Sequence, residues 1–580
     1  MSLTENKYFV TLKSYMDRVV KNQITEIKDP HFYGAVLCPS CMHAHGRIAD
    51  AVYPLVAMYH YTSDVKYLDC ARRTVEWSEH NLLRTGGEYF NDKLNSWIGT
   101  TVFTSISFGE TLVLHGDVLP EDFYSYIYKI YVRLTDFVRY KFIESGFDTN
   151  VNYFAAYASA MSIAYRLTGK PDYADSARAM LKKLFDRFVV DGIVVGEGMR
   201  SKSPKGLYGV DIGYNVEETL PALSACAHYL EDAELERTVM DMWRRHLEFM
   251  LPDGAWDNSF GSRHDKWTYY GSRTSDGAAT GLCYVWNKDP IFAEAAERNL
   301  ELMRICSKDG YLYGGRMYIE AGEEPCLHHS FTHAKSFAAM IDHGFIYKEK
   351  VSLPREEKYG RRHIAASKVE LVSLGDFRAT VSACDAFHHK GACTGGGCMT
   401  MLWHERVGAI FAATMAKYER AEPYNMQYTR RFESIPCLSM RVASGKYSSV
   451  NAKDAKVTVQ AQENCVSIFA EGILQSDDFE RSGKYSLSYE FSPESVKIFA
   501  SSECAGELVL PVICGMDGVL HIDGTVATVK RGGAAINVAA DAKIVCENEK
   551  AFNLVGGFVA SILKINIEEG QSVSAEISVV

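Results

Sequence analysis

The chain has 580 residues, of which 47% are hydrophobic and 23% charged, so it is long enough and apolar enough for two or more folded domains. Its formal net charge of −11 argues against a nucleic-acid backbone as partner, and no apolar run reaches the roughly 18 residues needed to cross a membrane. The first twenty residues lack the apolar region of a signal peptide, and the 15 cysteines are odd in number and scattered. We therefore expect a cytoplasmic protein, or a periplasmic one if a native signal peptide has been removed, with neither nucleic acid nor membrane as partner.

A helical repeat runs through the first 345 residues. The segments that begin at Tyr59 and Tyr165 share Tyr, Thr, Tyr, Asp, Ala and Arg at the same offsets. The segment from Tyr284 follows the same frame, and the segment from Ala227 follows it more loosely. Each copy is typical of two helices joined by a tight turn. Apolar inner helices are predicted at 46–60, 100–114, 153–167, 215–229, 272–286 and 330–343, and amphipathic outer helices at 8–23, 64–82, 121–140, 172–189, 232–250 and 289–306. Six alternating pairs predict an (α/α)6 toroid over residues 1–345.

The pattern changes after about Lys350. Residues 346–365 are charged and contain a proline, which is typical of a linker. Beyond them, segments such as KVELVSL, FRATVSA, YSLSYEF and SVKIFAS alternate with a period of two residues between Gly, Asn, Asp or Ser turns. Many short strands without helices predict an antiparallel β-sandwich over residues 366–580.

The unusual motifs of the helical region all precede or begin a predicted inner helix. They lie at 38–47, 86–99, 148–154, 209–218, 252–277 and 325–333. The connections from outer to inner helices of a toroid share one rim, so these six segments should surround a single funnel. The N–H groups that begin the inner helices would favour anionic groups there.

The richest of these segments, residues 252–277, is predicted to be a long surface loop with a functional role. Its aromatic side chains are candidates for stacking on sugar rings, and its arginines are candidates for holding a carboxylate in bidentate fashion. The candidates are Trp256, Trp267 and Tyr269 for stacking, and Arg263 and Arg273 for the carboxylate, with Arg47 from the first segment. The alternative is a loop that packs its own aromatic residues.

Our first hypothesis is a glycoside hydrolase with two carboxylates, because hydrolysis needs a protonated carboxyl for the leaving oxygen and a second carboxylate. Glu218, or its neighbour Glu217, is the candidate acid. Asp257, Asp265 and Asp276 in the long segment are candidates for the partner carboxylate. The alternative role of the two glutamates is to complement the dipole of a helix N-terminus.

The second hypothesis is a polysaccharide lyase, in which a Tyr or His moves the proton beside a carboxyl group while Asn, Arg or His offsets the carboxylate charge. Tyr270 and His264 are the candidate catalytic pair, and Asn152 and Asn215 are candidates for the carboxylate. His328 is expected on the rim of the funnel. A third hypothesis is a glycan-binding protein without catalysis.

A zinc site is suggested by Cys38-Pro-Ser-Cys41 followed by His43 and His45, but no second CxxC pair follows. His329 and His333 lie four residues apart without the glutamate of a zincin. We therefore expect these histidines to line the rim and the thiols to pack, and we assign neither a metal nor a cofactor.

A toroid followed by a β-sandwich resembles two groups of carbohydrate-active proteins, and the segments CPSCMHAHGRIADAVYP, GVDIGYNVEETLP and WDNSFGSRHDKWTYYGSRTSDG carry the likeness. These groups are the heparinase-type polysaccharide lyases and the (α/α)6 glycoside hydrolases specific for uronic acids, including β-glucuronidase-like proteins. The resemblance implies an enzyme that acts on uronic-acid-containing oligosaccharides or polysaccharides. Between the two reactions, the glutamate pair and the acidic loop favour hydrolysis as the expected one.

Overall fold

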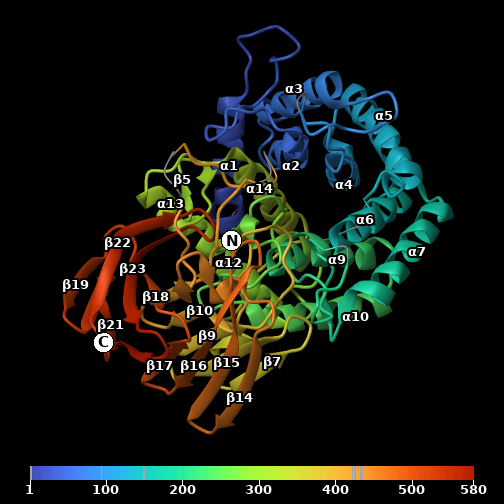
Figure 1. The fold of residues 1–580 in the computed structure, drawn as a ribbon. Coiled ribbons are helices and arrows are strands. Elements are labelled where there is room, and N and C mark those ends of the chain that lie inside the picture. Colours follow the sequence, from blue (N-terminus) through green and yellow to red (C-terminus); the bar gives the residue numbers. More distant parts are fainter. Residues whose placement is uncertain are drawn as a thin grey trace.

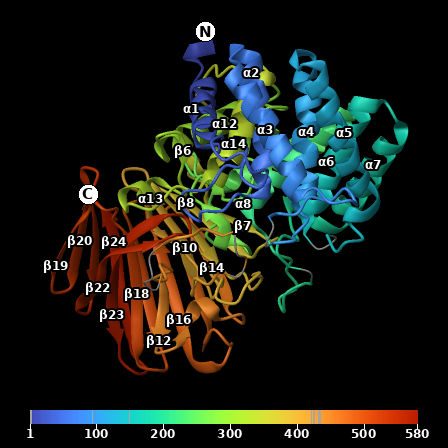
Figure 2. The ribbon, with the colours of Figure 1, turned by 90° about the horizontal axis from the view of Figure 1, so that it is seen from above.

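The computed structural model describes residues 3–92, 95–147, 150–199, 201–420, 422, 426–430 and 435–580. Its helices form a curved, toroid-like arch in the first part of the chain, and its strands form a separate β-rich region (Figures 1 and 2). Within the described residues, no helix is both long and apolar enough to span a membrane. The fold is therefore the predicted one, a helical toroid followed by antiparallel sheets.

The helices alternate between an outer and an inner layer. The outer helices are α1 (Lys7–Asn22), α3 (Val65–Leu82), α5 (Glu121–Phe137), α7 (Pro171–Phe188), α10 (Ala233–His246) and α12 (Pro290–Ile305). The inner helices are α2 (Val52–Thr62), α4 (Thr100–His115), α6 (Val151–Thr168), α8 (Ile212–Tyr214) continued by α9 (Leu220–Tyr229), α11 (Ala279–Leu282) and α14 (Leu327–Asp342). The last inner helix packs against α1 and α2, so the final pair meets the first.

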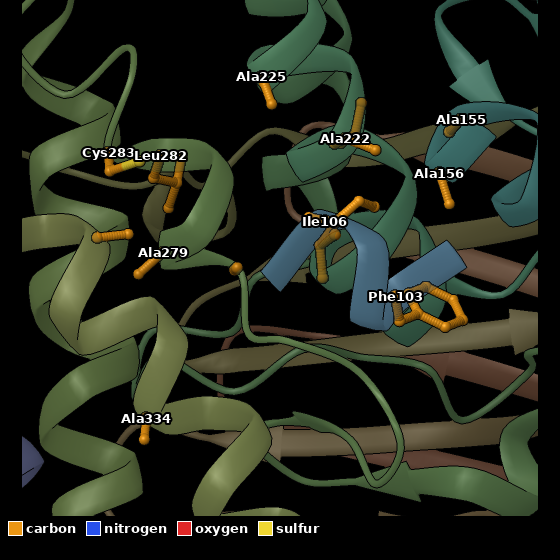
Figure 3. Packing of buried hydrophobic residues seen from close by; sticks show 14 of the residues in the cluster. Phe103, Ile106, Ala155, Ala156, Ala222, Ala225, Ala279, Leu282, Cys283 and Ala334 are labelled. Carbon is orange, nitrogen blue, oxygen red and sulfur yellow. The ribbon is translucent and has the colours of Figure 1, made fainter. Parts of the chain in front are cut away.

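The tight turn between α6 and α7 shows how the sequence sets this alternation. Gly169 ends α6 with a φ of +69°, a left-handed conformation that costs glycine little. Pro171 then occupies the first turn of α7, where its missing N–H costs nothing. Helix α7 buries residues spaced three and four apart, whereas residues 151–164 of α6 are all buried. The inner layer therefore needs small side chains, and Figure 3 shows Ala156, Ala222 and Ala279 on neighbouring inner helices.

The fifth inner helix differs from the prediction for residues 272–286. The helix there is one short turn, Ala279–Leu282, and the residues before it form the strands β3 (Trp267–Thr268) and β4 (Gly271–Ser272) and bends. Gly277 has a φ of +87° and Gly281 packs against the backbone of Pro221. Glycines are weak helix formers, and here they serve close packing instead.

The strands that follow the helical region form two antiparallel sheets. One has the order β11-β10-β9-β8-β7 and the other β19-β20-β21-β24-β17-β16-β15-β13-β12-β18-β23-β22, with β14 beside β15. The smaller sheet comprises β7 (Gly360–Ile364), β8 (Val369–Leu374), β9 (Phe377–Ser382), β10 (Cys398–His404) and β11 (Gly408–Ala412). The larger comprises β12 (Arg441–Ser444), β13 (Tyr447–Ser448), β14 (Lys456–Gln462), β15 (Cys465–Gln475), β16 (Arg481–Phe491), β17 (Ser495–Ser502), β18 (Gly506–Ile513), β19 (Val519–Asp523), β20 (Val526–Arg531), β21 (Ala534–Ala540), β22 (Ile544–Asn553), β23 (Phe558–Ile567) and β24 (Ser572–Val579). Side chains from both sheets share one hydrophobic core.

Residues 252–277 join the two regions rather than forming a surface loop. Nearly all of them are buried. The Gly556 N–H of the β-region donates to the carbonyl of Trp267 over 2.9 Å, and the Arg355 guanidinium contacts the carboxylate of Asp257 at 3.5 Å. The prediction of a surface loop is wrong, because the sheets cover this segment.

Candidate active site

All six predicted segments contribute to one cleft of about 420 Å³ at the rim of the toroid. It is lined by Arg47, Asn95, Trp97, Phe103, Ser145, Gly146, Phe147, Asn150, Asn152, Tyr153, Tyr214, Glu218, Arg263, Lys266, Thr274, His328 and Glu422. Asp148 and Thr149 of the third segment lie outside the described residues. The topological argument from the sequence therefore locates the cleft.

The first turn of α6 supplies an amide pair to the cleft. Asn150 is the residue before the helix, and its side chain makes no capping hydrogen bond. Asn152 donates from its side-chain nitrogen to Oε2 of Glu218 over 2.7 Å, while its Oδ1 has no partner among the described residues. The amides are therefore placed where they can meet a polar group of a ligand.

Glu218 lies opposite this turn and is 7% exposed. Burial raises the pKa of its carboxyl to about 8, although the nearby Arg47 guanidinium lowers it. At neutral pH the carboxyl is therefore mostly protonated and can donate a hydrogen bond. Among the predicted residues, Glu218, Asn152, Arg47, Arg263 and His328 line the cleft.

Tyr214, which the sequence analysis missed, also faces the cleft. Its hydroxyl is hydrogen-bonded to Oγ1 of Thr274 at 2.5 Å. The Arg263 guanidinium lies 4.7 Å from the ring centroid and the Lys266 ammonium 5.6 Å. Burial raises the phenol pKa well above its ordinary value, and Arg263 opposes that shift. The motif GVDIGYNVEE contained this tyrosine, and its position four residues before Glu218 was the available signal.

His328 occupies the second position of α14 and is 1% exposed. Neither ring nitrogen has a hydrogen-bond partner within the described residues, and the ring stacks on Phe331 at 5.0 Å. Burial lowers the imidazole pKa well below its ordinary value, and Arg273 and Arg47 lower it further. The ring is therefore neutral and holds an available lone pair.

The cations of the cleft are held by acidic partners. Arg263 pairs with Glu197 at 2.7 Å and with Glu422 at 2.8 Å, and Lys266 also contacts Glu422. Arg47 pairs with Asp276 at 3.0 Å as well as with Asp50. These pairs fix the positions of the cations, so the predicted free bidentate grip of Arg263 on a uronate is not available in this arrangement.

An aromatic wall that the sequence analysis did not assign faces these polar groups. Trp97 and Phe147 lie with ring centroids 6.3 Å apart, and Phe103 and Tyr153 complete the wall. Such faces are suited to stacking on sugar rings. Trp97 lies in one of the six converging segments. The sequence of that segment gave no reason to prefer Trp97 over the tryptophans of residues 252–277 as a sugar-stacking residue.

The aromatic residues predicted to stack on sugar are in the wrong place. Trp256 and Trp267 have no exposed surface, and the Trp267 ring packs 5.7 Å from that of Phe558. The hydroxyl of Tyr269 donates to Asp253 over 2.9 Å and its ring meets Phe558 at 5.3 Å. These side chains belong to the junction with the sheets.

The predicted lyase pair does not reach the cleft either. Tyr270 is fully buried, with its hydroxyl 2.7 Å from Nδ1 of His329. His264 is also fully buried. Asn215 donates from its side chain to the carbonyl of Val194 over 2.9 Å, inside the core. Burial removes all three predicted residues from contact with a substrate.

The carboxylates proposed to partner Glu218 are already engaged. Glu217 is fully buried and accepts hydrogen bonds from the N–H of Ser272 at 2.7 Å and from Ser275 Oγ at 2.8 Å. Asp257 accepts from Thr380 Oγ1 over 2.5 Å. Asp276 lies 2.5 Å from the ammonium of Lys335 and lines a small cavity of about 40 Å³ that shares Glu218 with the cleft. Asp265 is fully buried, so no second carboxylate of the predicted set lines the cleft to flank a glycosidic bond.

Two clusters among the described residues have the donor atoms of a metal site. One is Cys38, Cys41 and His45, and the other is His388, His389 and Glu422. The predicted substrate residue Arg273 lies beside the first, since its guanidinium donates to Sγ of Cys326 over 3.2 Å. Arg273 is 1% exposed and does not line the cleft.

Comparisons with family models and with a curated relative indicate the same protein family. The chain matches the model of the ulvan lyase N-terminal domain over residues 12–356 and that of the ulvan lyase C-terminal domain over residues 362–580. It is 39% identical over 429 residues to a broad-specificity ulvan lyase of Formosa agariphila, in an alignment that covers 72% of this chain and 67% of that protein.

Solved lyases share the fold. The structure of chondroitin AC lyase from Streptomyces coelicolor A3 is similar with a TM-score of 0.60 at 12% identity, over 98% of this chain and 79% of that one. Heparinase III is similar with a TM-score of 0.56 at 11% identity, over 91% and 75%. The prediction that hydrolysis is the reaction is wrong, as the family matches and the engaged carboxylates both indicate, and the alternative of a lyase is supported. The chain belongs to the ulvan lyase family and is a carbohydrate-active enzyme, a polysaccharide lyase.

Proposed function

We propose that this lyase cleaves ulvan, or a closely related uronate polysaccharide, by β-elimination. The observation that carries the mechanism is that one cleft combines the imidazole of His328, whose ring nitrogens have no hydrogen-bond partner in the described part of the chain, with the phenol of Tyr214. The relative named a broad-specificity ulvan lyase supports the substrate class. The engaged state of Glu217, Asp257 and Asp276 supports elimination over a reaction that uses one of them beside Glu218.

Elimination at a uronate requires three actions of the active site. The charge of the substrate carboxylate must be offset, the proton on the adjacent carbon must be removed, and the leaving glycosidic oxygen must be protonated. The electron pair of the broken C–H bond forms the new C=C bond, and the C–O bond to the leaving sugar breaks. No water is consumed.

We assign the carboxylate to Asn152, Asn150 and the protonated Glu218. A carboxylic acid can donate a short hydrogen bond to a carboxylate, whereas an ionised one would repel it. The pKa of about 8 keeps Glu218 in the donating form at neutral pH. The first turn of α6 adds the positive end of its helix dipole on the same side.

We assign proton removal to His328 and protonation of the leaving oxygen to Tyr214. The imidazole is neutral and holds an available lone pair, as a base must. The phenol keeps its proton until the leaving oxygen develops charge, and Arg263 and Lys266 beside the ring then stabilise the phenolate that remains. Trp97 and Phe147 would hold neighbouring sugars by stacking.

Ultraviolet absorbance tests the reaction directly. The new C=C bond is conjugated with the carboxylate, so absorbance should rise in step with reducing ends during digestion of ulvan. Chondroitin sulfate, heparan sulfate and alginate serve as comparison substrates. Reducing ends that appear without a matching absorbance, or no cleavage of any uronate polysaccharide, would contradict the proposal.

A further inference from the structure

Three cysteines and one histidine from distant parts of the chain meet next to His328 of the cleft. Cys38 and Cys41 lie on the segment before the 3-10 helix Gly46–Ala51, and His45 immediately precedes that helix. The sulfurs of Cys38 and Cys41 and a ring nitrogen of His45 all lie within 4.8 Å of one another, and Cys326 is not part of that mutually close set. Cys326, the residue before α14, places its sulfur 3.9 Å from that of Cys38.

Two of the separations suit a tetrahedral zinc ion. Zn–S bonds of about 2.3 Å and Zn–N bonds of about 2.0 Å imply ligand separations of about 3.8 Å between sulfurs and about 3.5 Å between sulfur and nitrogen. The observed Cys38–Cys326 distance is 3.9 Å, and Sγ of Cys41 lies 3.2 Å from Nε2 of His45. Three thiolates and one imidazole form a usual closed set for structural zinc.

The local backbone also holds the two sulfurs of the CxxC segment together. The Met42 N–H donates to the carbonyl of Cys38 over 2.8 Å, and the Cys38 N–H donates to the carbonyl of His43 over 3.0 Å. Met42 has a φ of +60°, a left-handed conformation that is uncommon outside glycine. The turn thus closes on itself and directs both thiols to one side.

A nearby cation matches the charge that such a centre would carry. Zn²⁺ with three thiolates has a formal charge of −1, which is costly to bury unless it is offset. Arg273 is 1% exposed and donates from Nη2 to Sγ of Cys326 over 3.2 Å. This contact gives a role to an arginine that the substrate cannot reach, since groups around a metal commonly orient and tune its ligands.

A disulfide accounts for these contacts less well than a metal ion does. A Cys38–Cys326 disulfide would require the sulfurs to move from 3.9 Å to about 2.0 Å, and it would leave Cys41 and His45 without a reason to meet. The second cluster, around Glu422, is a poorer cation site than the cysteine cluster. Its carboxylate already contacts Arg263 and Lys266, whose charges would repel a metal ion.

We propose that Cys38, Cys41, His45 and Cys326 bind one structural zinc ion. Its four protein ligands leave no open position, so it takes no part in the reaction. It joins residues 38–45 to the beginning of α14 across 281 positions of sequence, the difference between 326 and 45. Arg47 follows the site by two residues and so does His328, whose ring lies 5.6 Å from that of His45. The ion therefore holds one side of the cleft in place.

Metal analysis of the purified full-length enzyme tests the site without any variant. We expect about one zinc atom per chain after gel filtration in a chelator-treated buffer, by inductively coupled plasma mass spectrometry. Exchange for Co²⁺ should give the visible bands of a tetrahedral cobalt centre together with a thiolate-to-cobalt band. A folded enzyme that lacks stoichiometric zinc when purified with zinc and reductant present, or a disulfide between any two of these cysteines in that protein, would overturn the proposal.

Two variants assign the ligands. Cys326→Ser should lose most of the zinc and lower the melting temperature, although Cys326 lies outside the CxxC segment, and Cys38→Ser should do the same. Cys465→Ser, at a half-buried free cysteine in β15, is the matched control and should keep both the zinc and the melting temperature. Zinc that remains at one atom per chain in a folded Cys326→Ser protein would contradict the four-ligand site.

Discussion

Tyr214 and Tyr270 lie 56 positions apart in sequence, yet only the first has its ring at the cleft. Replacing Tyr214 with Phe keeps the ring and removes the proton that we assign to the leaving oxygen. We expect kcat to fall by about 10²- to 10⁴-fold, the usual range for loss of a general acid, with KM little changed. Steady-state kinetics on ulvan measure the effect. Tyr270→Phe is the control and should keep activity within a few-fold, and the reverse order of effects would reassign the acid.

His328 provides the companion test on the other side of the reaction. His328→Gln retains a polar side chain but cannot accept a proton, so kcat should fall by about 10²-fold or more. The same variant should still bind an ulvan fragment, measured by calorimetry. If His328→Gln keeps full activity, the base lies elsewhere, and Tyr214 becomes the group that both removes and returns the proton.

The raised pKa of Glu218 gives a signed pH dependence. The carboxyl is protonated below its pKa of about 8 and ionised above it. Because the ionised form repels the substrate carboxylate, kcat/KM should decline as the pH rises through about 8. Glu218→Gln keeps a hydrogen-bond donor and has no proton to lose, so this decline should disappear. An identical alkaline limb in both proteins would show that another group titrates.

At the scale of elements, Trp97 and Trp267 have different roles, the first in substrate binding and the second in stability. Trp267 is fully buried at the junction and donates from Nε1 to the carbonyl of Trp256 over 2.9 Å. Trp267→Ala should lower the free energy of unfolding by about 3–5 kcal/mol, as for other buried aromatic residues. Trp97→Ala, at the half-buried cleft wall, should instead raise KM with little change in stability. Denaturant unfolding and kinetics on both variants distinguish the roles, and a shared effect on both quantities would contradict them.

The helical elements could be predicted because their signals are local. The turn between α6 and α7 carries Gly169 and Pro171, and the apolar spacing of α7 follows one helix face. The prediction of the fifth inner helix was wrong because Gly277 and Gly281 pack against residues that are distant in sequence, among them Pro221. Local periodicity holds no information about such partners.

The sequence predicted where the cleft lies, but it predicted only some of the residues that line it. Topology brings Arg47, Asn152, Glu218 and His328 together, since all lie near the beginnings of inner helices. Residues 252–277 misled because aromatic and charged side chains look alike whether they meet a sugar or a second domain. The residues that cover Trp267, such as Phe558, lie nearly 300 positions away.

At the scale of the whole molecule, the two regions share enough structure to unfold together. Tyr318 of the helical region donates to the carbonyl of Leu554 over 2.6 Å, and Lys205 donates to the carbonyls of Ala383 and Ala455 over 2.8 and 2.7 Å. With the buried junction at 252–277, neither region has a complete core without the other. Differential scanning calorimetry should therefore show one main transition, and two well-separated transitions would contradict a shared unit.

Glu422 comes from the chain between the two sheets' strands β11 and β12, yet it lines the cleft beside Arg263 and Lys266. The strand-rich region thus contributes a side chain to the cleft as well as packing against the helical region. Chimeras that combine helices of one relative with strands of another would inherit an unmatched pair of charges at that wall. Variants designed to change substrate preference should therefore replace Glu422, Arg263 and Lys266 together.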